Sequence, residues 1–333
     1  MALRTVLSDP MLRMLAGATV LAAILPASGE ARVAAQAVAN AAIFVLFLLN
    51  GLRIARREIA AGIANWRFLL PLVMWVFGFM ALAGWGLSVL GGGWMPPIIA
   101  LGFLYLGTLP STVQSATSYT SLAGGTVALS VVSAALLNIL GVLVSVPIFL
   151  ALGGSGEGAV GGEAIVKIIA ILILPFALGQ LFQTRAAAFT LRHKHRIVWI
   201  DRFVIAIAVY VAFSGAVEQG IWNRVDGASW AMLLASVTLF LAIGHGGAWL
   251  AGGALGLLRE DRIAFLFAGA QKSAAVGAPL ATILFPPAVS GFVVVPLLLY
   301  HLLQLVLAAP LATRLAHHRR SGGDDCSAPT TPG

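Results

Sequence analysis

The chain is a succession of apolar runs, each about as long as the ~20 residues that a helix needs to cross a bilayer core of roughly 30 Å. Short segments rich in glycine, proline and charged residues separate the runs. A membrane β-barrel would instead show short stretches of alternating hydrophobicity. The pattern therefore predicts an all-α polytopic membrane protein with ten transmembrane helices. The predicted spans cover about residues 11–28, 34–52, 67–90, 96–122, 125–151, 163–182, 198–217, 228–252, 262–284 and 288–313.

The first apolar run has the layout of a secretory signal peptide, with a basic start, an apolar middle and small residues after it. We interpret it instead as the first helix of the bundle. Its removal would leave an odd number of spans and would weaken the charge pattern described below.

A glycine-rich linker at residues 153–162 separates five predicted spans from five. An odd number of spans in each half gives the two halves opposite orientations in the membrane. The sequence thus predicts two inverted repeats, about 11–151 and 163–313, in one transporter unit that ends in a polar tail at 316–333. This arrangement is common in secondary transporters.

Composition excludes an ordinary soluble domain, because 60% of the residues are hydrophobic and 10% are charged, against about 25% charged in soluble proteins. The net charge of +8 permits a nucleic-acid partner as one reading. We favour basic loops that orient the bundle, and expect no nucleic acid as partner.

The basic residues support an even number of spans with both termini in the cytoplasm, in a protein of the bacterial inner membrane. With that orientation, sixteen of the twenty Lys and Arg residues fall on the cytoplasmic side. They are Arg4, Arg13, Arg53, Arg56, Arg57, Arg67, Arg185, Arg192, Lys194, Arg196, Arg202, Arg259, Arg262, Arg314, Arg319 and Arg320.

The segment Thr108–Gly125 is polar although it lies largely inside the fourth predicted span. Pro110 cannot donate a backbone hydrogen bond and clashes with the preceding turn, so we expect an interruption there. Carbonyl groups near Thr108 and Leu109 are then freed and need partners within hydrocarbon. The polar side chains around the break are Ser111, Thr112, Gln114, Ser115, Thr117 and Ser118.

These side chains can satisfy the freed carbonyls, coordinate a small cation or hydrogen-bond a polar solute. Any single hydroxyl is more simply explained as a backbone cap or as a small residue at a helix contact. The cluster as a whole we interpret as a candidate binding site for substrate or ion.

The ninth predicted span is interrupted at Gly269–Ser273, and Lys272 lies near its middle. Matching interruptions in two halves of a transporter point to the binding site. A lysine at this depth is costly and is by default a functional candidate. None of the twelve acidic residues falls deep inside a span. We therefore expect freed carbonyls, hydroxyls or a bound anion to be the partners of Lys272, beside Gln271 and Ser273.

Two roles for Lys272 stay open. The amine could carry a proton during transport, or it could be a permanent tethered cation in the place of a sodium ion.

Three further polar residues within spans are lesser candidates. Asn138 could reach the fourth span or simply hold helices together. His301 and Gln304 are three residues apart and so share a helix face, where a histidine is more often structural than a proton relay.

The sequence contains no HExxH or GxSxG motif and no intramembrane acid pair, so it does not indicate an enzyme. A single cysteine, Cys326, permits neither a disulfide framework nor a metal site of cysteines. We expect no cofactor beyond a coupling sodium ion or proton.

Several stretches together resemble the bile acid:sodium symporter superfamily, in its SBF-like branch of bacterial symporter-like proteins and the vertebrate member seven of solute carrier family 10. They are LPSTVQSATSYTSLAGGTVALSVVSAALLNILG, FLLNGLRI, DRFVIAIAVYVAFSGAVEQGIW, AGAQKSAAVGAPLA and LLLYHLLQLVLAAPLA. The resemblance covers nearly the whole chain.

The resemblance implies broken, crossing helices 4 and 9. It also implies a panel of helices 1, 2, 6 and 7, and a core of helices 3–5 and 8–10. Gln271 and Ser130 match ion-site positions of the sodium-coupled members, and Ser115 fits with one inserted residue. Phe267 stands where those members carry a glutamate, and Lys272 replaces an amide. These departures argue against coupling to two sodium ions.

We therefore expect a symporter-like secondary carrier of an amphipathic organic anion, coupled to sodium or protons, with no obligate protein partner. The alternative is a non-transporting membrane regulator of ion homeostasis or of a partner complex.

Overall fold

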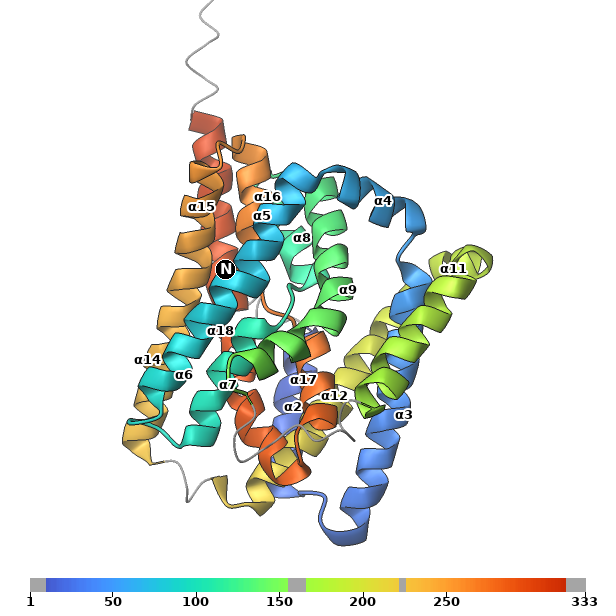
Figure 1. The fold of residues 1–333 in the computed structure, drawn as a ribbon, viewed down its shortest axis with the longest axis vertical. Helices are drawn as coiled ribbons and strands as arrows, with labels where there is room; N and C mark the ends of the chain where they lie inside the picture. The colour runs from blue at the N-terminus through green and yellow to red at the C-terminus, as the bar shows by residue number, and fades with distance from the viewer. Residues whose placement is uncertain (1–9, 155–165, 222–225, 322–333) are drawn as a thin grey trace, which may run out of the picture.

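The computed structural model describes residues 10–154, 166–221 and 226–321, and within these ranges its regular structure is entirely helical (Figure 1). The predicted all-helical class is confirmed for this part of the chain. The α-helices are α2 (Pro10–Ile24), α3 (Gly29–Arg53), α4 (Arg56–Ala64), α5 (Trp66–Val73), α6 (Met80–Gly91), α7 (Pro97–Thr108), α8 (Val113–Leu122), α9 (Val127–Ala151), α11 (Leu174–Arg192), α12 (Lys194–Glu218), α14 (Gly227–Ala242), α15 (Ala248–Ala254), α16 (Arg259–Ala270), α17 (Ala274–Leu284) and α18 (Pro287–Ser321). Three π-helical turns continue between α-helices: η1 (Met74–Phe79), η2 (Ile169–Ile173) and η3 (Ile243–Gly247).

Eight helical stretches of the described residues are long and apolar enough to cross a membrane, or nine if the bent pair α7–α8 is one span. The helix α2 is apolar but has only 15 residues. Each of the ten predicted ranges overlaps one of these segments. The chain is thus a polytopic helical membrane protein, whereas the count of ten crossings and the inverted repeat stay predictions.

Some local structure differs from what the hydropathy pattern predicts. The helix α4 and the π-turns were not expected, because a short helix and an extra residue in a turn leave no hydropathy signal. The helix α18 continues to Ser321, so the predicted tail begins as helix. Most of the predicted linker 153–162, and Cys326, lie outside the described residues.

Close backbone contacts at glycine pairs hold neighbouring helices together. A Cβ atom on Gly107 of α7 would lie 2.6 Å from the Met80 carbonyl oxygen, and one on Gly84 of α6 would lie 2.4 Å from the Phe103 carbonyl oxygen. Gly51 of α3 and Gly179 of α11 make an equally tight contact. Small residues at such positions let transmembrane helices pack by van der Waals contact.

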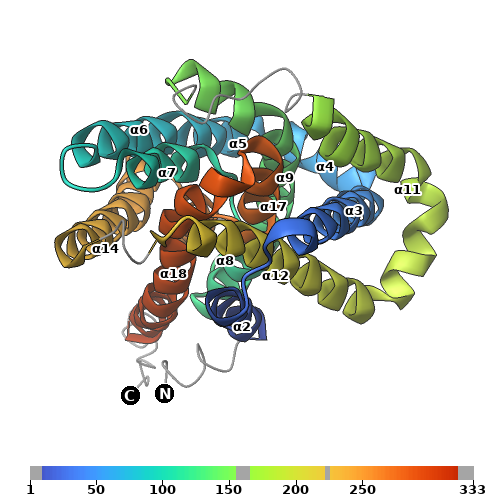
Figure 2. The same cartoon turned by 90° about the horizontal axis from the view of Figure 1, so that it is seen from below.

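One side of the bundle contains α2, α3, α11 and α12, which pack on one another (Figures 1 and 2). Ion pairs join α3 to α12 near both ends, between Arg32 and Glu218 and between Arg53 and Asp201. The two helices therefore run antiparallel.

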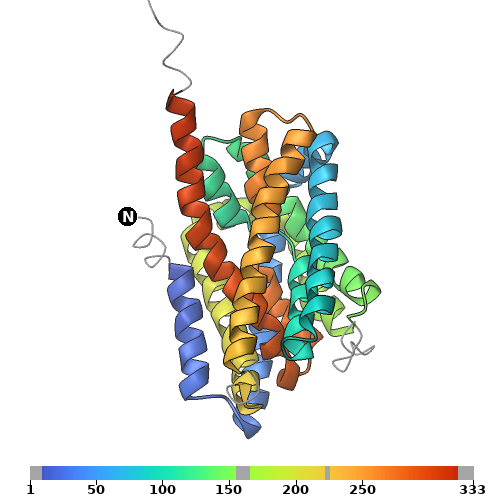
Figure 3. The same cartoon turned by 90° about the vertical axis from the view of Figure 1, so that its left-hand side faces the viewer.

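The helix α17 lies deep in the molecule, where it packs on α12 and α18 (Figure 2). In the stretch Arg259–Leu284, 94% of the most apolar window is buried inside the protein. The long helix α18 runs up the bundle beside it (Figure 3). The enclosed pair α16–α17 therefore contributes little to the lipid-facing surface and is placed to form an internal site.

The helix α4, the α11–α12 turn, the α15–α16 turn and the C-terminal end of α18 all lie at one end of the bundle, the upper end in Figure 1. These segments carry most of the basic residues that the sequence assigns to the cytoplasm. The fold is therefore compatible with the predicted orientation, which stays a prediction.

Candidate functional site

The first interruption lies between α7 and α8, whose axes differ by 63°. The helix α7 ends at Thr108, and Leu109 and Thr112 have extended backbone conformations. The break predicted at Pro110 is confirmed. Its cause is that Pro110 has no N–H to donate to a carbonyl of the preceding turn.

Side chains from other helices satisfy the carbonyls that this break frees. The Ser145 hydroxyl of α9 donates to the Thr108 carbonyl at 2.7 Å. The Asn138 amide of α9 donates to the Ser111 carbonyl at 2.8 Å. Buried carbonyls need such donors in a membrane interior. Asn138, left open by the sequence, thus supports the backbone of the break.

The second interruption lies between α16 and α17, where Gln271 and Ser273 are extended. The Ser273 hydroxyl accepts a bond from the Val276 N–H at 3.3 Å and so caps α17. The Tyr300 hydroxyl of α18 donates to the Ala270 carbonyl at 2.6 Å. The break predicted within Gly269–Ser273 is likewise confirmed.

Gln304 of α18 pairs with the extended backbone of the second break. Its Oε1 accepts from the Lys272 N–H at 2.8 Å, and its Nε2 donates to the Lys272 carbonyl at 3.1 Å. Nε2 also lies 2.9 Å from His301 Nδ1. The side chain thus replaces the helical partners that the interruption removes.

The two interruptions are in direct contact. The Ser273 N–H donates to the Pro110 carbonyl at 2.9 Å, and the Ser115 hydroxyl donates to Gln271 Oε1 at 2.9 Å. Residues more than 150 positions apart in the sequence therefore form one polar centre inside the bundle.

Lys272 is fully buried at this centre. Its ammonium group donates to the carbonyls of Gly107 and Leu109, both at 2.8 Å, and to the Val76 carbonyl at 3.3 Å. In the described part of the chain it makes no ion pair. The expectation that freed carbonyls would be its partners is confirmed for Gly107 and Leu109.

Three buried polar atoms beside the breaks have no hydrogen-bond partner among the described residues: Ser111 Oγ, Thr117 Oγ1 and Gln271 Nε2. Ser111 and Gln271 are fully buried. Unpaired buried polar groups are costly, and a ligand or water usually explains them. These atoms can therefore hydrogen-bond a polar solute.

The remaining predicted residues are less closely tied to this centre. Thr112 begins α8 but makes no side-chain cap, and Gln114 is exposed. The Ser130 hydroxyl accepts from Thr120 Oγ1 at 3.2 Å, at the end of α8 far from Pro110.

Three residues of the centre were not predicted from the sequence: Val76, Ser145 and Tyr300. Val76 contributes a main-chain carbonyl from the turn η1, for which side-chain chemistry gives no signal. Tyr300 carried a weak signal, because the hydroxyl of a buried tyrosine usually finds a partner.

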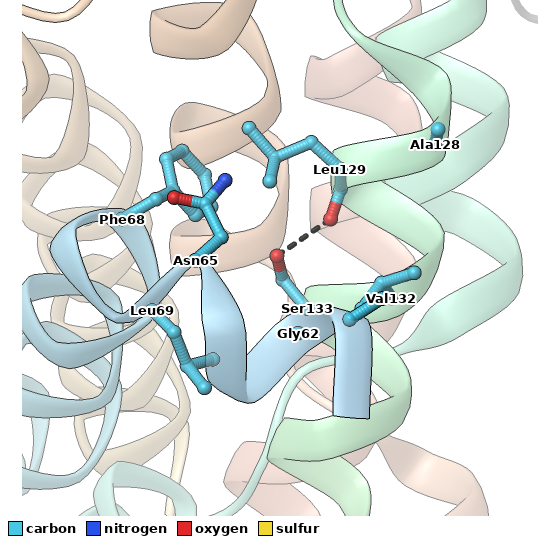
Figure 4. A pocket seen from close by; sticks show the side chains of 9 residues that line it. Gly62, Asn65, Phe68, Leu69, Ala128, Leu129, Val132 and Ser133 are labelled. Carbon is cyan, nitrogen blue, oxygen red and sulfur yellow. Dashed lines mark hydrogen bonds between the residues drawn. The ribbon is translucent and has the colours of Figure 1, made fainter. Parts of the chain in front are cut away.

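A small cleft of about 190 Å³ lies elsewhere, between α4, α5 and α9. Figure 4 shows its mainly apolar lining, with Asn65 and Ser133 as polar members. The Ser133 hydroxyl donates to the Leu129 carbonyl within its own helix. None of the predicted site residues lines this cleft.

No group of three or more His, Cys, Asp or Glu side chains within the described ranges could hold a metal ion. Two interrupted helices joined by a buried ammonium, inside a polytopic helical bundle, are instead features of a membrane transporter. The chain belongs to the SBF-like CPA transporter family, whose model matches residues 9–317.

The chain is also similar over its length to individual proteins. It is 36% identical over 323 residues to "Uncharacterized protein PA2026" of Pseudomonas aeruginosa, covering 97% of this chain and 96% of that one. It is 37% identical over 311 residues to "Putative symporter YfeH" of Escherichia coli, covering 92% of both. It is 22% identical over 279 residues to "Sodium/bile acid cotransporter 7" of Mus musculus, covering 81% of this chain and 80% of that one. The family is one of transporters, as the sequence predicted, and not of enzymes.

Proposed function

We propose that this protein is a secondary active carrier of an amphipathic organic anion, with its binding site where the α7–α8 and α16–α17 interruptions meet. The observation that carries the proposal is the set of unpaired buried atoms beside the Lys272 ammonium. Gln271 Nε2 and the Ser111 hydroxyl can donate hydrogen bonds to an anionic group, and the ammonium supplies positive charge. The name of the mouse relative supports an amphipathic anion such as a bile acid.

The proposed mechanism is alternating access between two groups of helices. The group α2, α3, α11 and α12 would be the panel, and the remaining membrane helices, which carry both interruptions, would be the core. The two groups would descend from inverted five-helix repeats. Movement of the core against the panel would expose the site to one side of the bacterial inner membrane and then to the other, with both termini cytoplasmic.

Coupling would use sodium or protons. Ser115 and Gln271 are joined by a hydrogen bond at the centre, and their side-chain oxygen atoms are able to coordinate a sodium ion, whereas Ser130 is paired with Thr120 near the other end of α8. Phe267 aligns with a glutamate of the sodium-coupled members that the chain resembles. An apolar side chain there removes a negative charge that would favour binding of a second sodium ion.

The test is uptake into proteoliposomes with imposed sodium and proton gradients, applied separately. Radiolabelled taurocholate is the first probe, followed by smaller amphipathic carboxylates and sulfonates. The proposal predicts accumulation driven by one gradient and absent from protein-free liposomes. If neither gradient drives accumulation of any probe, the carrier interpretation fails and the regulator becomes the better account.

The substitution Gln271→Leu distinguishes a binding role from a structural one. It removes the unpaired Nε2 and, with it, the Oε1 acceptor of the part-buried Ser115 hydroxyl, so the two effects oppose each other and the thermal midpoint should change little. It also removes a donor to the solute, so KM for uptake should increase roughly tenfold, the equivalent of one hydrogen bond. Gln114→Leu on the exposed face of α8 is the matched control and should leave KM unchanged. A large loss of stability in Gln271→Leu with unchanged KM would contradict the assignment.

A further inference from the structure

The carbonyl groups around the Lys272 amine have the features of a cation site. Two belong to the C-terminal end of α7, at Gly107 and Leu109, and the third is that of Val76 in η1. Partial negative charge gathers at a helix C-terminus, and the carbonyls of unwound helix ends coordinate cations in transporters. We refer to these three carbonyls as the carbonyl cage.

The geometry fits a charged amine. Three acceptors surround the nitrogen, and only the ammonium form has three N–H donors. A neutral amine would turn its lone pair toward one of the oxygens. Because the group is fully buried and makes no ion pair among the described residues, the carbonyls and the helix dipole provide the compensation.

The protein also fixes the amine in position. The backbone of Lys272 is held by Gln304 on α18, and the adjacent Ser273 N–H is held by the Pro110 carbonyl. A flexible surface lysine could withdraw its amine, but this one is anchored at both its backbone and its nitrogen.

We propose that the carbonyl cage is a monovalent-cation site that the Lys272 ammonium occupies permanently. The inference rests on the proposed function in one respect: the carrier would then keep a fixed positive charge at the centre, and its coupling ion would bind outside the cage. Removing the side chain should vacate the cage and let an external monovalent cation enter.

The test compares Lys272→Ala with Lys272→Met in purified protein. Alanine leaves space next to the three carbonyls, whereas methionine fills it with an apolar chain. Thermal midpoints are measured at constant ionic strength in ammonium, potassium or sodium chloride, each against choline chloride, whose cation is too large to enter. The readout needs no transported substrate, so it can fail or succeed independently of the uptake experiment.

The expected result is a rise of about 2–4 °C in the thermal midpoint of Lys272→Ala in at least one of the three salts. A cation present at roughly ten times its Kd stabilises the folded state by about RT ln 10, and that free energy corresponds to a midpoint shift of this size. In wild type and Lys272→Met, whose cage is filled, any rise comes from a coupling site outside the cage, so the rise in Lys272→Ala should exceed theirs in the same salt. Equal midpoints for Lys272→Ala in all four salts would overturn the proposal, as would an equal rise in Lys272→Met.

If Lys272→Ala does not survive purification in choline, the same comparison is made on fluorescent fusions solubilised directly from membranes. A monodisperse size-exclusion peak that Lys272→Ala recovers in ammonium, potassium or sodium chloride, and that Lys272→Met does not, supports a vacated cation site. Absence of the peak in every salt overturns it.

Discussion

The two interruptions differ in what they contribute to the centre. The α7–α8 break is made by a proline, bends the chain by 63° and presents carbonyl oxygens. The α16–α17 break contains no proline between its helices, lies within the single span Arg259–Leu284, and presents a lysine and a side-chain amide. The first break supplies the carbonyl acceptors for the Lys272 ammonium and the Ser273 N–H. Between side chains the direction is reversed, because the Ser115 hydroxyl donates to Gln271 Oε1. Each break thus satisfies groups that the other leaves open.

The two breaks are also supported by different neighbouring helices. Carbonyls of the first break receive bonds from α9, at Ser145 and Asn138. The backbone of the second is held by α18, at Gln304 and Tyr300. Each interruption thus depends on a different neighbouring helix, and substitutions can weaken one without directly touching the other.

The largest expected effect comes from Lys272→Met, which removes the hydrogen bonds from the ammonium of the second break to the carbonyls of the first. The carbonyls of Gly107 and Leu109 lose their donor, at about 1–3 kcal/mol for each orphaned group, and uptake should fall to the level of protein-free liposomes. Thermal unfolding and proteoliposome uptake measure the two effects. The exposed Lys194 at the start of α12 gives the control Lys194→Met, which should behave as wild type; equal behaviour of both variants would contradict this role of Lys272.

Next in size is Gln304→Leu, which affects the second break. The N–H and the carbonyl of Lys272 are left without this partner, and unfolding should become easier by roughly 2–4 kcal/mol. Gln114→Leu serves again as the matched exposed control. A stable Gln304→Leu protein with normal uptake would show that the second break does not need α18.

A smaller effect is expected for Gly141→Ala, which affects the first break. A Cβ atom there would lie 2.5 Å from the Pro110 ring, and overpacking of this kind costs about 1–3 kcal/mol. Gly17→Ala is the control, because a Cβ atom at Gly17 meets nothing within 4 Å. Thermal unfolding in detergent measures the difference. Equal midpoints for Gly141→Ala and Gly17→Ala would contradict the close contact between Gly141 and Pro110.

The smallest effect is expected for Ser145→Ala, which deprives only the Thr108 carbonyl of its donor. The loss should be about 1–2 kcal/mol. Ser133→Ala on the same helix is matched to it, since the Ser133 hydroxyl donates to Leu129 one turn away and its loss should cost less. A larger loss for Ser133→Ala would reverse the ranking and argue that the break is not stabilised from α9.

The sequence predicted those parts of the site that follow from a single residue's chemistry. Pro110 cannot continue a helix, and Lys272 in an apolar run must find partners, so both interruptions and the use of freed carbonyls could be predicted. The contribution of Val76 could not, because every residue has a carbonyl and only the fold brings this one to the amine, 196 positions away.

In the fold, too, some features could be predicted from the sequence and others depend on helix packing. Spans with strong apolar runs, such as α9 and α12, were predicted to within a few residues. The π-turn η1 and the pairing of Gln304 with the Lys272 backbone depend on how helices face one another. His301 and Gln304 were correctly placed on one helix face, but their target on the second break required the three-dimensional arrangement.

The most direct test of the central claim is an experimental density map of the protein in a lipid nanodisc, resolved well enough to place the Lys272 side chain. The account predicts two interrupted helices in contact, with the Lys272 nitrogen within about 3.2 Å of the Gly107 and Leu109 carbonyl oxygens. A nitrogen that reaches the lipid headgroups, or continuous and separate helices in place of α7–α8 and α16–α17, would contradict it.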